Sequence, residues 1–460
     1  MTVARRNYPL LLGSQFLGAF GDNAILAVIV GQLTRLQQEG GITLDELRTR
    51  SAVYTSLLFI PYVLLAPLAG YLNDRYAKTS WLLGGNLVKL IGTAVCGLSV
   101  WYGYVWQAPG YLIVGIGSTI YGPAKYGILP EILLRERLVK ANGMVELLTL
   151  LAILTGAIGG SVIVDHLSVG FCYLILLGIF VGSMALNLLM AHTPSDPSVR
   201  VGKSVGAFVK HFALMLTGIS VSRPRGHRTW REYLFDRYWI TLISSLMRGV
   251  WHGPRLGKIL IGTALFWVSG AAMKINFQPW GLDVLKLPDN TQIALLGLWL
   301  SVGVMVGSVL AGVWYRVGDL HHIRRFGFLL AALLALVFLV GPLDLVHVGQ
   351  HVFERVRPDG TRVVTLVVMP AVMLVLIAAG VAAGLFLIPL NAALQAESDP
   401  TKLGKTIAVQ NFGDNIGMIL AGLLVLGCAH IGLTASQVFL VLAALVAVVV
   451  GWLRIPRKES

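Results

Sequence analysis

The sequence predicts an all-α integral membrane protein with 12 transmembrane helices in two six-helix bundles and with both termini in the cytoplasm. Three observations predict this fold class: the composition, the succession of apolar runs and the placement of basic residues. Hydrophobic residues make up 56% of the 460 residues, charged residues make up 13%, and the mean hydropathy is +0.76. A soluble chain carries a charged fraction of about 25%. The composition therefore excludes an ordinary soluble domain.

Twelve apolar runs follow one another along the chain. Each is close to the ~20 residues that a helix needs to span the hydrocarbon core. Backbone groups in lipid must be hydrogen-bonded within the protein, so each run is predicted to be a helix; the sequence lacks the alternation typical of an outer-membrane barrel. The runs lie near 9–34, 51–73, 80–103, 109–131, 141–165, 169–191, 258–282, 291–316, 324–345, 365–391, 404–430 and 434–454.

The basic residues are distributed unevenly between the two sides of these runs. With the N-terminus placed inside, 26 of the 36 Lys and Arg residues fall on the inner side, seven fall outside, and three (Lys89, Lys125 and Lys274) fall within runs. This asymmetry is the positive-inside pattern, and it predicts that both termini are cytoplasmic. The net charge of +14 is therefore mainly a topology signal, with lipid head groups as a secondary partner and no nucleic acid.

The order of the runs predicts three parts: a six-helix bundle at 1–191, a basic cytoplasmic linker at 192–257 and a second six-helix bundle at 258–460. Weak internal similarity supports the two halves. Pro123 and Glu131 end the fourth run, while Pro389 and Glu397 recur at the same separation at the end of the tenth. Such matches in corresponding helices indicate a duplication of six helices. Arg5 and Arg6 before an apolar run resemble a signal peptide, but Asp22 interrupts that run and we expect a retained first helix.

One tetrapeptide occurs twice at membrane depth. Phe20-Gly21-Asp22-Asn23 lies in the first run, and Phe412-Gly413-Asp414-Asn415 lies in the eleventh. An ionisable residue there costs about 2.5–3.5 kcal/mol on insertion scales, so it usually faces a polar interior and marks a substrate or ion path. This pattern indicates a transporter. The alternative is a carboxylate that is tied to a neighbouring helix purely for packing.

Six ionisable residues lie well within the runs, three of each sign: Asp22, Glu146 and Asp414 against Lys89, Lys125 and Lys274. Balanced charges suit a zwitterionic or phosphate-bearing substrate, whereas a proton-coupled sugar or drug carrier can work with carboxylates alone. Three internal salt bridges without a ligand are the alternative, and Lys89 is the most probable structural member of the six.

Helical spacing places polar side chains on coherent stripes. In the first run Gln15 precedes Asp22 by seven residues, and Lys125 follows Tyr121 by four residues in the fourth. In a two-bundle carrier such stripes line a site near the midplane. The predicted substrate-binding residues are Gln15, Asp22, Asn23, Tyr121, Lys125, Asn142, Glu146, Lys274, Asn391, Gln410 and Asp414.

No catalytic or metal-binding pattern is visible in the sequence. There is no nucleophile triad, metal cluster or phosphate loop, and Gly115-Ile116-Gly117 lies inside an apolar run rather than after a strand. Cys96, Cys172 and Cys428 all lie in apolar runs without metal spacing. His321 and His322, in an inner loop, are expected to face solvent. We therefore predict no enzyme, no cofactor and no metal.

Gly70-Tyr-Leu-Asn-Asp74-Arg75-Tyr-Ala-Lys78 lies at the short inner turn after the run at 51–73. It resembles the signature loop of the major facilitator superfamily, Gly-x-x-x-Asp-Arg with a following basic residue. Its glycine allows close helix approach, and its carboxylate can pair with a positive group across the inner gate. Asp74 and Arg75 are accordingly predicted to be gating residues. The equivalent segment Gly312–Arg316 keeps the glycine but lacks the Asp-Arg pair.

Six segments together resemble the bacterial lysophospholipid transporters of this superfamily. They reach from the first run to the eleventh: Gln15–Asn23, Pro123–Leu129, Val139–Glu146, Leu265–Lys274, Pro389–Gln395 and Ile407–Asn415. The resemblance implies a flippase of the bacterial inner membrane that moves lysophosphatidylethanolamine, and also lysophosphatidylglycerol, from the outer to the inner leaflet for re-acylation. Where that family has an arginine in the seventh helix, this sequence has Lys274, which keeps the charge but loses the bidentate fork.

The resemblance also implies partners. The family often works beside an acyltransferase/acyl-carrier-protein synthetase, and because this chain ends at Ser460 we expect that enzyme to be a separate protein. We also expect the transporter to be a monomer. Two other functions remain open. One is a proton-coupled exporter of amphipathic small molecules, with Asp22 or Glu146 as the proton site. The other is a non-transporting membrane subunit that anchors a lipid-modifying enzyme through the basic linker.

Overall fold

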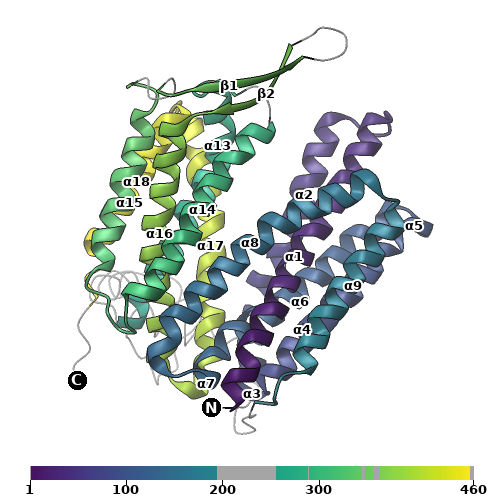
Figure 1. Cartoon of the computed structure of the whole chain (residues 1–460), viewed down its shortest axis with the longest axis vertical. Coiled ribbons are helices and arrows are strands. Elements are labelled where there is room, and N and C mark those ends of the chain that lie inside the picture. The colour runs from purple at the N-terminus through teal and green to yellow at the C-terminus, as the bar shows by residue number, and fades with distance from the viewer. Residues whose placement is uncertain (1, 194–254, 288–289, 344–347, 357–361, 456–460) are drawn as a thin grey trace, which may run out of the picture.

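The computed structural model describes residues 2–193, 255–287, 290–343, 348–356 and 362–455, and these residues fold mainly as long helices (Figure 1). A helix lies over each of the twelve apolar runs, and nine of the described helices are long and apolar enough to cross a membrane. The predicted all-α membrane fold is confirmed. The linker predicted at 192–257 lies almost wholly outside the described residues.

The first half contains seven longer helices and several one-turn pieces. The short pieces α5 (Ser99–Tyr102), η1 (Tyr104–Trp106), α7 (Leu129–Ile132) and η2 (Arg135–Arg137) connect them. The longer helices are α1 (Thr2–Gln38), α2 (Leu44–Leu64), α3 (Ala66–Arg75), α4 (Lys78–Gly97), α6 (Gln107–Gly127), α8 (Leu138–His166) and α9 (Val169–Leu188).

The second half contains six long helices, a single helical turn and a hairpin. The turn is η3 (Pro400–Lys402), and the hairpin pairs β1 (His351–Val356) with β2 (Arg362–Val368) in antiparallel register. The long helices are α13 (Arg255–Asp283), α14 (Asn290–Trp314), α15 (Ile323–Leu339), α16 (Pro370–Glu397), α17 (Leu403–His430) and α18 (Ala435–Trp452).

Two predicted runs were wrong in detail. The run at 51–73 holds two helices, because Pro67 at the start of α3 lacks an N–H and interrupts the helix beyond Leu65. α2 begins earlier than predicted, at Leu44, where Thr43 and Glu46 form a capping box. The run at 365–391 begins in β2, whose Val-rich sequence favours a strand, and its helix starts only at Pro370.

Small residues let the helices pack closely. Gly156 and Gly160 of α8 lie against the backbone of α1, and Gly303 and Gly307 of α14 lie against α16; this small-x-x-x-small spacing lets membrane helices approach closely. Any Cβ at these positions would collide with the facing backbone. Each half is thus a tightly packed group of helices.

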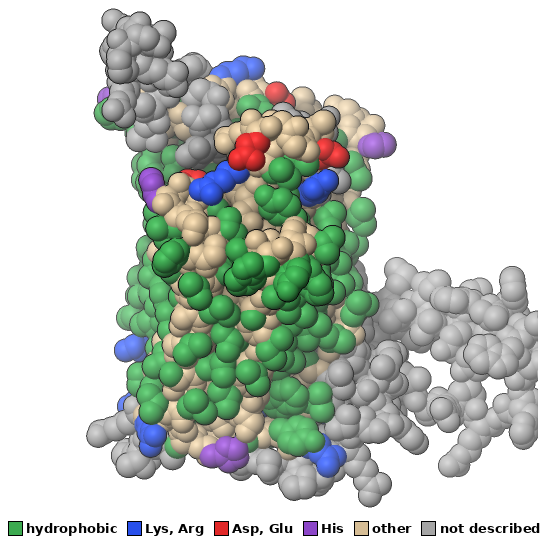
Figure 2. All heavy atoms as spheres, turned by 90° about the vertical axis from the view of Figure 1, so that its right-hand side faces the viewer, with side chains coloured by type: hydrophobic (Ala, Val, Ile, Leu, Met, Phe, Trp, Pro, Cys, Tyr) green, Lys and Arg blue, Asp and Glu red, His purple; other side chains and the backbone are tan. Residues whose placement is uncertain are grey.

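The surface matches a membrane environment. Figure 2 shows hydrophobic side chains covering the middle of one face, with charged side chains gathered toward the two ends. Large side chains such as Phe171 and Leu174 are more than half exposed, which suits contact with lipid tails. Trp101 and Tyr102 are largely exposed at the end of their helix, where aromatic rings sit at the level of the head groups.

The two halves meet at the end of the molecule where α3, α7 and the N-terminus lie (Figure 1). There α3 packs on α17, while α8 packs on α14 and α16. Gly143 of α8 faces the backbone of Ser308 in α14, and Gly70 of α3 faces Gly404 and Lys405 in α17. We call this set of contacts the inner gate.

Candidate functional site

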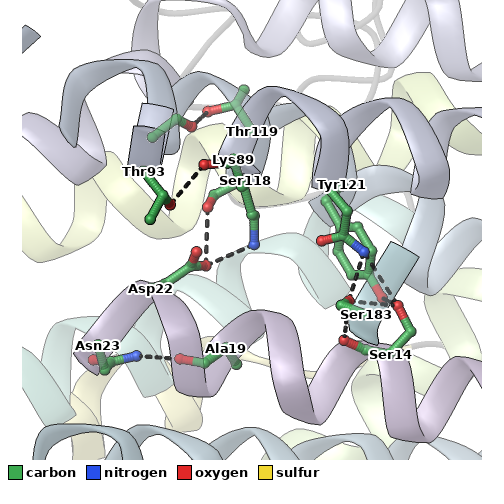
Figure 3. A network of polar contacts seen from close by, with 12 residues as sticks. Ser14, Ala19, Asp22, Asn23, Lys89, Thr93, Ser118, Thr119, Tyr121 and Ser183 are labelled. Atoms are coloured by element: carbon green, nitrogen blue, oxygen red, sulfur yellow. Dashed lines mark hydrogen bonds and ion pairs between the residues drawn. The ribbon is translucent and has the colours of Figure 1, made fainter. Parts of the chain in front are cut away.

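Asp22 is bound to a cation inside the first half. Lys89 Nζ of α4 lies 2.7 Å from Asp22 Oδ2, and the Ser118 hydroxyl of α6 donates to the same oxygen at 2.9 Å (Figure 3). Both charged residues are buried, with exposed fractions of 8% and 2%. The partners explain how an ion pair is tolerated at this depth, because each charge is hydrogen-bonded as well as neutralised.

A hydroxyl and amide network lies beside this pair, with Lys89 Nζ 5.1 Å from the centroid of the Tyr121 ring. The members of the network other than Tyr121 were missed from the sequence. The Tyr121 hydroxyl lies 3.2 Å from Ser14 Oγ, and Asn86 Nδ2 donates to Ser183 Oγ and to Asn187 Oδ1 at 2.7 Å each. Single serines and asparagines in apolar runs carry no pattern that distinguishes them. Since Ser14 joins Tyr121 to this network, the predicted site residue Tyr121 is held within the first half (Figure 3).

A second charged cluster lies where the two halves adjoin. Glu146 of α8 is 2% exposed and is hydrogen-bonded by the Tyr126 hydroxyl of α6, and it interacts electrostatically with the half-buried Lys125. Lys125 Nζ also stands 4.5 Å from the centroid of the Tyr126 ring. Asp414 of α17 interacts electrostatically with Glu146, so its carboxylate belongs to the same cluster. We call these four residues, Lys125, Tyr126, Glu146 and Asp414, the junction cluster.

Asp414 has different neighbours from Asp22. It is 5% exposed and is hydrogen-bonded to the Thr263 hydroxyl of α13, while its Oδ1 atom, like that of Asp22, has no hydrogen-bond partner among the described residues. In the described part of the chain no Lys, Arg or His forms a salt bridge with it. Lys274 is exposed on α13 and lies 11 residues beyond Thr263, about 16 Å along the helix. Three internal salt bridges, the alternative reading of the six buried charges, are therefore not all formed among the described residues.

The predicted residues Gln15 and Asn142 are engaged by backbone or side-chain partners. Gln15 Nε2 donates to the Val145 carbonyl at 3.1 Å and to Thr149 of α8. Asn142 and Gln395 form two reciprocal amide hydrogen bonds of 2.9 Å each, between α8 of one half and α16 of the other. Asn142 thus lies in the inner gate, one turn from Glu146.

Of the remaining predicted residues, Asn391 and Gln410 join two helices, whereas Asn23 is hydrogen-bonded within its own helix. Asn391 Oδ1 accepts from Gln410 Nε2 at 2.7 Å, which joins α16 to α17. Asn23 donates to the carbonyl of Ala19, four residues back in its own helix, at 2.8 Å (Figure 3). Asn415 does the same toward Asn411 at 2.7 Å, so the repeated tetrapeptide has the same local geometry in both places.

The predicted gating residue Asp74 bridges the halves. Its Oδ1 accepts from the Gly404 backbone N–H at 2.5 Å, and its Oδ2 accepts from the Lys405 N–H at 3.0 Å. These N–H groups belong to the first turn of α17, where the helix itself supplies no acceptor, which is a favourable place for an anion. Burial raises the pKa of Asp74 to about 6, although both backbone hydrogen bonds and Lys78 lower it. Arg75 lies with its guanidinium 5.8 Å from the Tyr76 ring.

The helix-end glutamates that suggested a duplication both form ion pairs. Glu131 Oε1 lies 3.0 Å from Lys78 Nζ at the start of α4, and Glu397 pairs with Arg255 at the start of α13 at 2.6 Å. In each half the glutamate is joined to a cation at the first turn of another helix.

Asp319, His321 and His322 lie close together in the loop between α14 and α15. Their ligand atoms are within 4.8 Å of one another, and among the described residues they are a group that could hold a metal ion. His321 Nδ1 contacts the Asp319 carboxylate directly, and the His321 side chain is 58% exposed. The predicted solvent-facing position of His321 agrees with this exposure, and the contact to Asp319 is a surface ion pair when the imidazole is protonated.

Comparison with known proteins identifies relatives over most of the chain. The sequence profile of the Major Facilitator Superfamily matches residues 8–352. The lysophospholipid transporter LplT of Photorhabdus laumondii is 30% identical over 416 residues, which cover 90% of this chain and 86% of that protein. The LplT of Enterobacter sp. (strain 638) is 30% identical over 415 residues, which cover 88% of this chain and 85% of that protein.

Solved structures share the fold. The human organic anion transporter MFSD10 superposes with a TM-score of 0.68 at 13% identity, covering 98% of this chain and 99% of the other. The fucose:proton symporter FucP of E. coli superposes with a TM-score of 0.66, also at 13% identity, covering 98% of each chain. At these identities the likeness concerns the arrangement of helices and not the substrate.

Proposed function

The chain belongs to the Major Facilitator Superfamily and, within it, to the lysophospholipid transporters, and from this premise we propose that it is a flippase for lysophospholipids. It moves lysophosphatidylethanolamine and lysophosphatidylglycerol from the outer to the inner leaflet of the bacterial inner membrane, where a separate acyltransferase restores the second chain. We expect the transporter to work as a monomer.

The observation that carries this proposal is the junction cluster. A lysophospholipid head group has a phosphate anion and either an ammonium or hydroxyls. Lys125 offers a half-buried cation for the phosphate, while Glu146 and Asp414 offer carboxylates for the ammonium. Electrostatic attraction is stronger at such a site than in water, because the surrounding helices exclude solvent.

The closed inner gate supports the direction of loading. Asp74 and the Asn142–Gln395 pair hold the halves together at the end where the positive-inside pattern places the cytoplasm. With that topology the cluster is closed to the cytoplasm in this conformation, and the head group enters from the outer side. Opening of the gate after binding then releases it inward, by the alternating movement of the two halves.

Lipid transport by purified protein tests the proposal. Full-length protein is reconstituted in liposomes with fluorescent lysophosphatidylethanolamine in one leaflet, and the fraction that crosses is measured by quenching from outside. We expect saturable movement in the wild type and at least a tenfold loss in Lys125→Gln and Glu146→Gln. Lys286→Gln, which removes an exposed cation three residues beyond the end of α13, is the matched control and should transport normally.

Two outcomes would contradict the proposal. Tolerance of all substitutions in the junction cluster would favour a non-transporting membrane subunit. Movement of amphipathic cations that lack a phosphate, with no movement of the lysophospholipid, would favour an exporter of small molecules. Saturable lysophospholipid movement that needs Lys125 supports the flippase whether or not an ion gradient affects its rate.

A further inference from the structure

Tyr126 contacts both opposite charges of the first half in the junction cluster. Its hydroxyl is hydrogen-bonded to Glu146 of α8, and Lys125 Nζ stands 4.5 Å from the centroid of its ring. Lys125 and Tyr126 are consecutive residues of α6. A single neutral side chain is therefore a partner of the cation and of the carboxylate at the same time.

Within the described residues, Lys125 and Glu146 form no salt bridge with each other. They interact electrostatically, but the ion pairs of the described chain, such as Lys89 with Asp22 and Lys78 with Glu131, do not include them. Opposite charges attract strongly where helices exclude water, so a buried lysine and glutamate left to themselves should meet directly. Their separation needs a cause.

The Asp22–Lys89 pair shows what that cause is. Lys89 also faces a tyrosine ring, with Nζ 5.1 Å from the centroid of Tyr121. The Tyr121 hydroxyl, however, lies 3.2 Å from Ser14 Oγ, and Asp22 is free to approach Lys89 to 2.7 Å. A ring beside the ammonium therefore does not prevent a salt bridge. The difference at the junction cluster is the hydroxyl, whose single hydrogen serves the carboxylate.

Building on the proposed function, we propose that Tyr126 is a positioning residue that holds Glu146 away from Lys125. The empty site then presents a separate cation and a separate anion to a zwitterionic head group. The phosphate of lysophosphatidylethanolamine meets Lys125, and its ammonium, one ethylene group away, meets Glu146, without first breaking a salt bridge. A ligand binds more tightly to a site that is already arranged, because less free energy is lost in rearranging it.

This role makes Tyr126 a determinant of head-group preference. Lysophosphatidylglycerol needs the Lys125 cation, but it offers Glu146 neutral hydroxyls in place of an ammonium. It should therefore depend less on an available Glu146 carboxylate. A purely structural role is the alternative, since Tyr126 also packs against the apolar core of the first half. Such a role predicts fewer active molecules and an unchanged KM.

Cross-linking tests the separation without requiring transport. A membrane-permeable carbodiimide joins a carboxylate to an amine where the two are in contact, and mass spectrometry of the purified full-length protein measures each product. In the wild type we expect the Asp22–Lys89 product and little product between Lys125 and Glu146. Tyr126→Phe, which keeps the ring and the packing, should increase the second product about tenfold. Equal yields of that product in wild type and Tyr126→Phe would overturn the proposal.

Two controls accompany the cross-linking. The Asp22–Lys89 yield should be the same in wild type and Tyr126→Phe, which shows that the variant is folded. Tyr121→Phe makes the same chemical change beside the other pair and should leave both yields unchanged, because the Tyr121 hydroxyl does not hold Asp22. An increase of the Lys125–Glu146 product in Tyr121→Phe equal to that in Tyr126→Phe would overturn the specific role of Tyr126.

Transport kinetics separate this proposal from the function on which it rests. In liposomes, Tyr126→Phe should raise the KM for lysophosphatidylethanolamine about tenfold, raise the KM for lysophosphatidylglycerol less, and leave the maximal rate of both near that of the wild type. Tyr102→Phe, at an exposed tyrosine, should change neither. A raised KM without the new cross-link would make the hydroxyl a direct ligand of the lipid and overturn the positioning role. Absence of lipid movement in the wild type would overturn the proposed function, while the cross-linking would still decide whether Tyr126 separates the two charges.

Discussion

The same four residues, Phe-Gly-Asp-Asn, occur at 20–23 and at 412–415, and the structure gives them different neighbours. In both places the aspartate is buried and the asparagine donates to the carbonyl four residues before it. Asp22 is paired with Lys89 at 2.7 Å, whereas Asp414 is hydrogen-bonded to Thr263. The local sequence therefore determines the helix and the hydrogen bond that the asparagine makes. The helices packed opposite determine which partners the aspartate has.

The two aspartates also differ in their place relative to the halves. All partners of Asp22 come from α4 and α6 of its own half, so a movement of one half against the other leaves them together. The junction cluster around Asp414 draws Lys125, Tyr126 and Glu146 from the other half. Only the second site is rearranged when the inner gate opens, so the Asp22 pair supports its own half and Asp414 belongs to the part of the molecule that moves.

Removal of Lys89 should give the largest effect. Lys89→Met leaves the Asp22 carboxylate buried without a cation, and breaking a buried ion pair in this way costs about 3–5 kcal/mol. The unfolding free energy in detergent, from denaturant titration, should fall by that amount. The double variant Asp22→Asn/Lys89→Met removes both charges and should recover most of the loss. Equal stability of Lys89→Met and wild type would remove the contrast between the two sites.

Replacing each aspartate by asparagine compares the sites directly. Asp22→Asn leaves Lys89 unpaired and should cost about 3 kcal/mol of unfolding free energy. Asp414→Asn breaks no ion pair among the described residues and should change stability by less than about 1 kcal/mol. The two variants share the same chemical change and the same helical context, so each is the control for the other. A larger loss in Asp414→Asn would indicate an ionised Asp414.

Much of this organisation could be predicted from the sequence, and the limits have physical reasons. Apolar runs of membrane length predicted where the helices lie, because lipid allows few other structures. β2 was missed, since a Val-rich strand at the end of an apolar run has the same hydropathy as helix. Its partner β1 was missed because it lies between two predicted runs and carries Glu354 and Arg355. The pairing of Asp22 with Lys89 could not be assigned, because 67 residues separate them and any of three lysines could have matched.

Opening of the inner gate should expose the junction cluster to water from the cytoplasmic side, and it should leave the Asp22–Lys89 pair buried. Gln395→Ala removes two amide hydrogen bonds between the halves, each worth about 0.5–1.5 kcal/mol, and should shift the equilibrium toward the open gate by about 2 kcal/mol. Spin labels at Arg137→Cys and Arg316→Cys, both exposed at this end, would report the longer distance. Asn23→Ala, which removes an amide that bonds only within α1, is the control and should leave the distance distribution unchanged.

Asp74 should make the gate weakly dependent on pH. Its pKa is about 6 in the closed gate and returns toward the ordinary value near 3.8 when gate opening exposes the carboxyl to water. The conformation that binds the proton more tightly is favoured by acid, so the closed gate gains stability as pH falls through 6, and that gain is complete below about 4. Between pH 7 and pH 5 the closed-to-open ratio should rise roughly tenfold, measured with the same spin labels. In Asp74→Asn the tenfold change should be lost, and any remaining pH dependence would come from another group. An undiminished tenfold change in that variant would assign the titration to the junction cluster, to which Asp414 belongs and Asp22 does not.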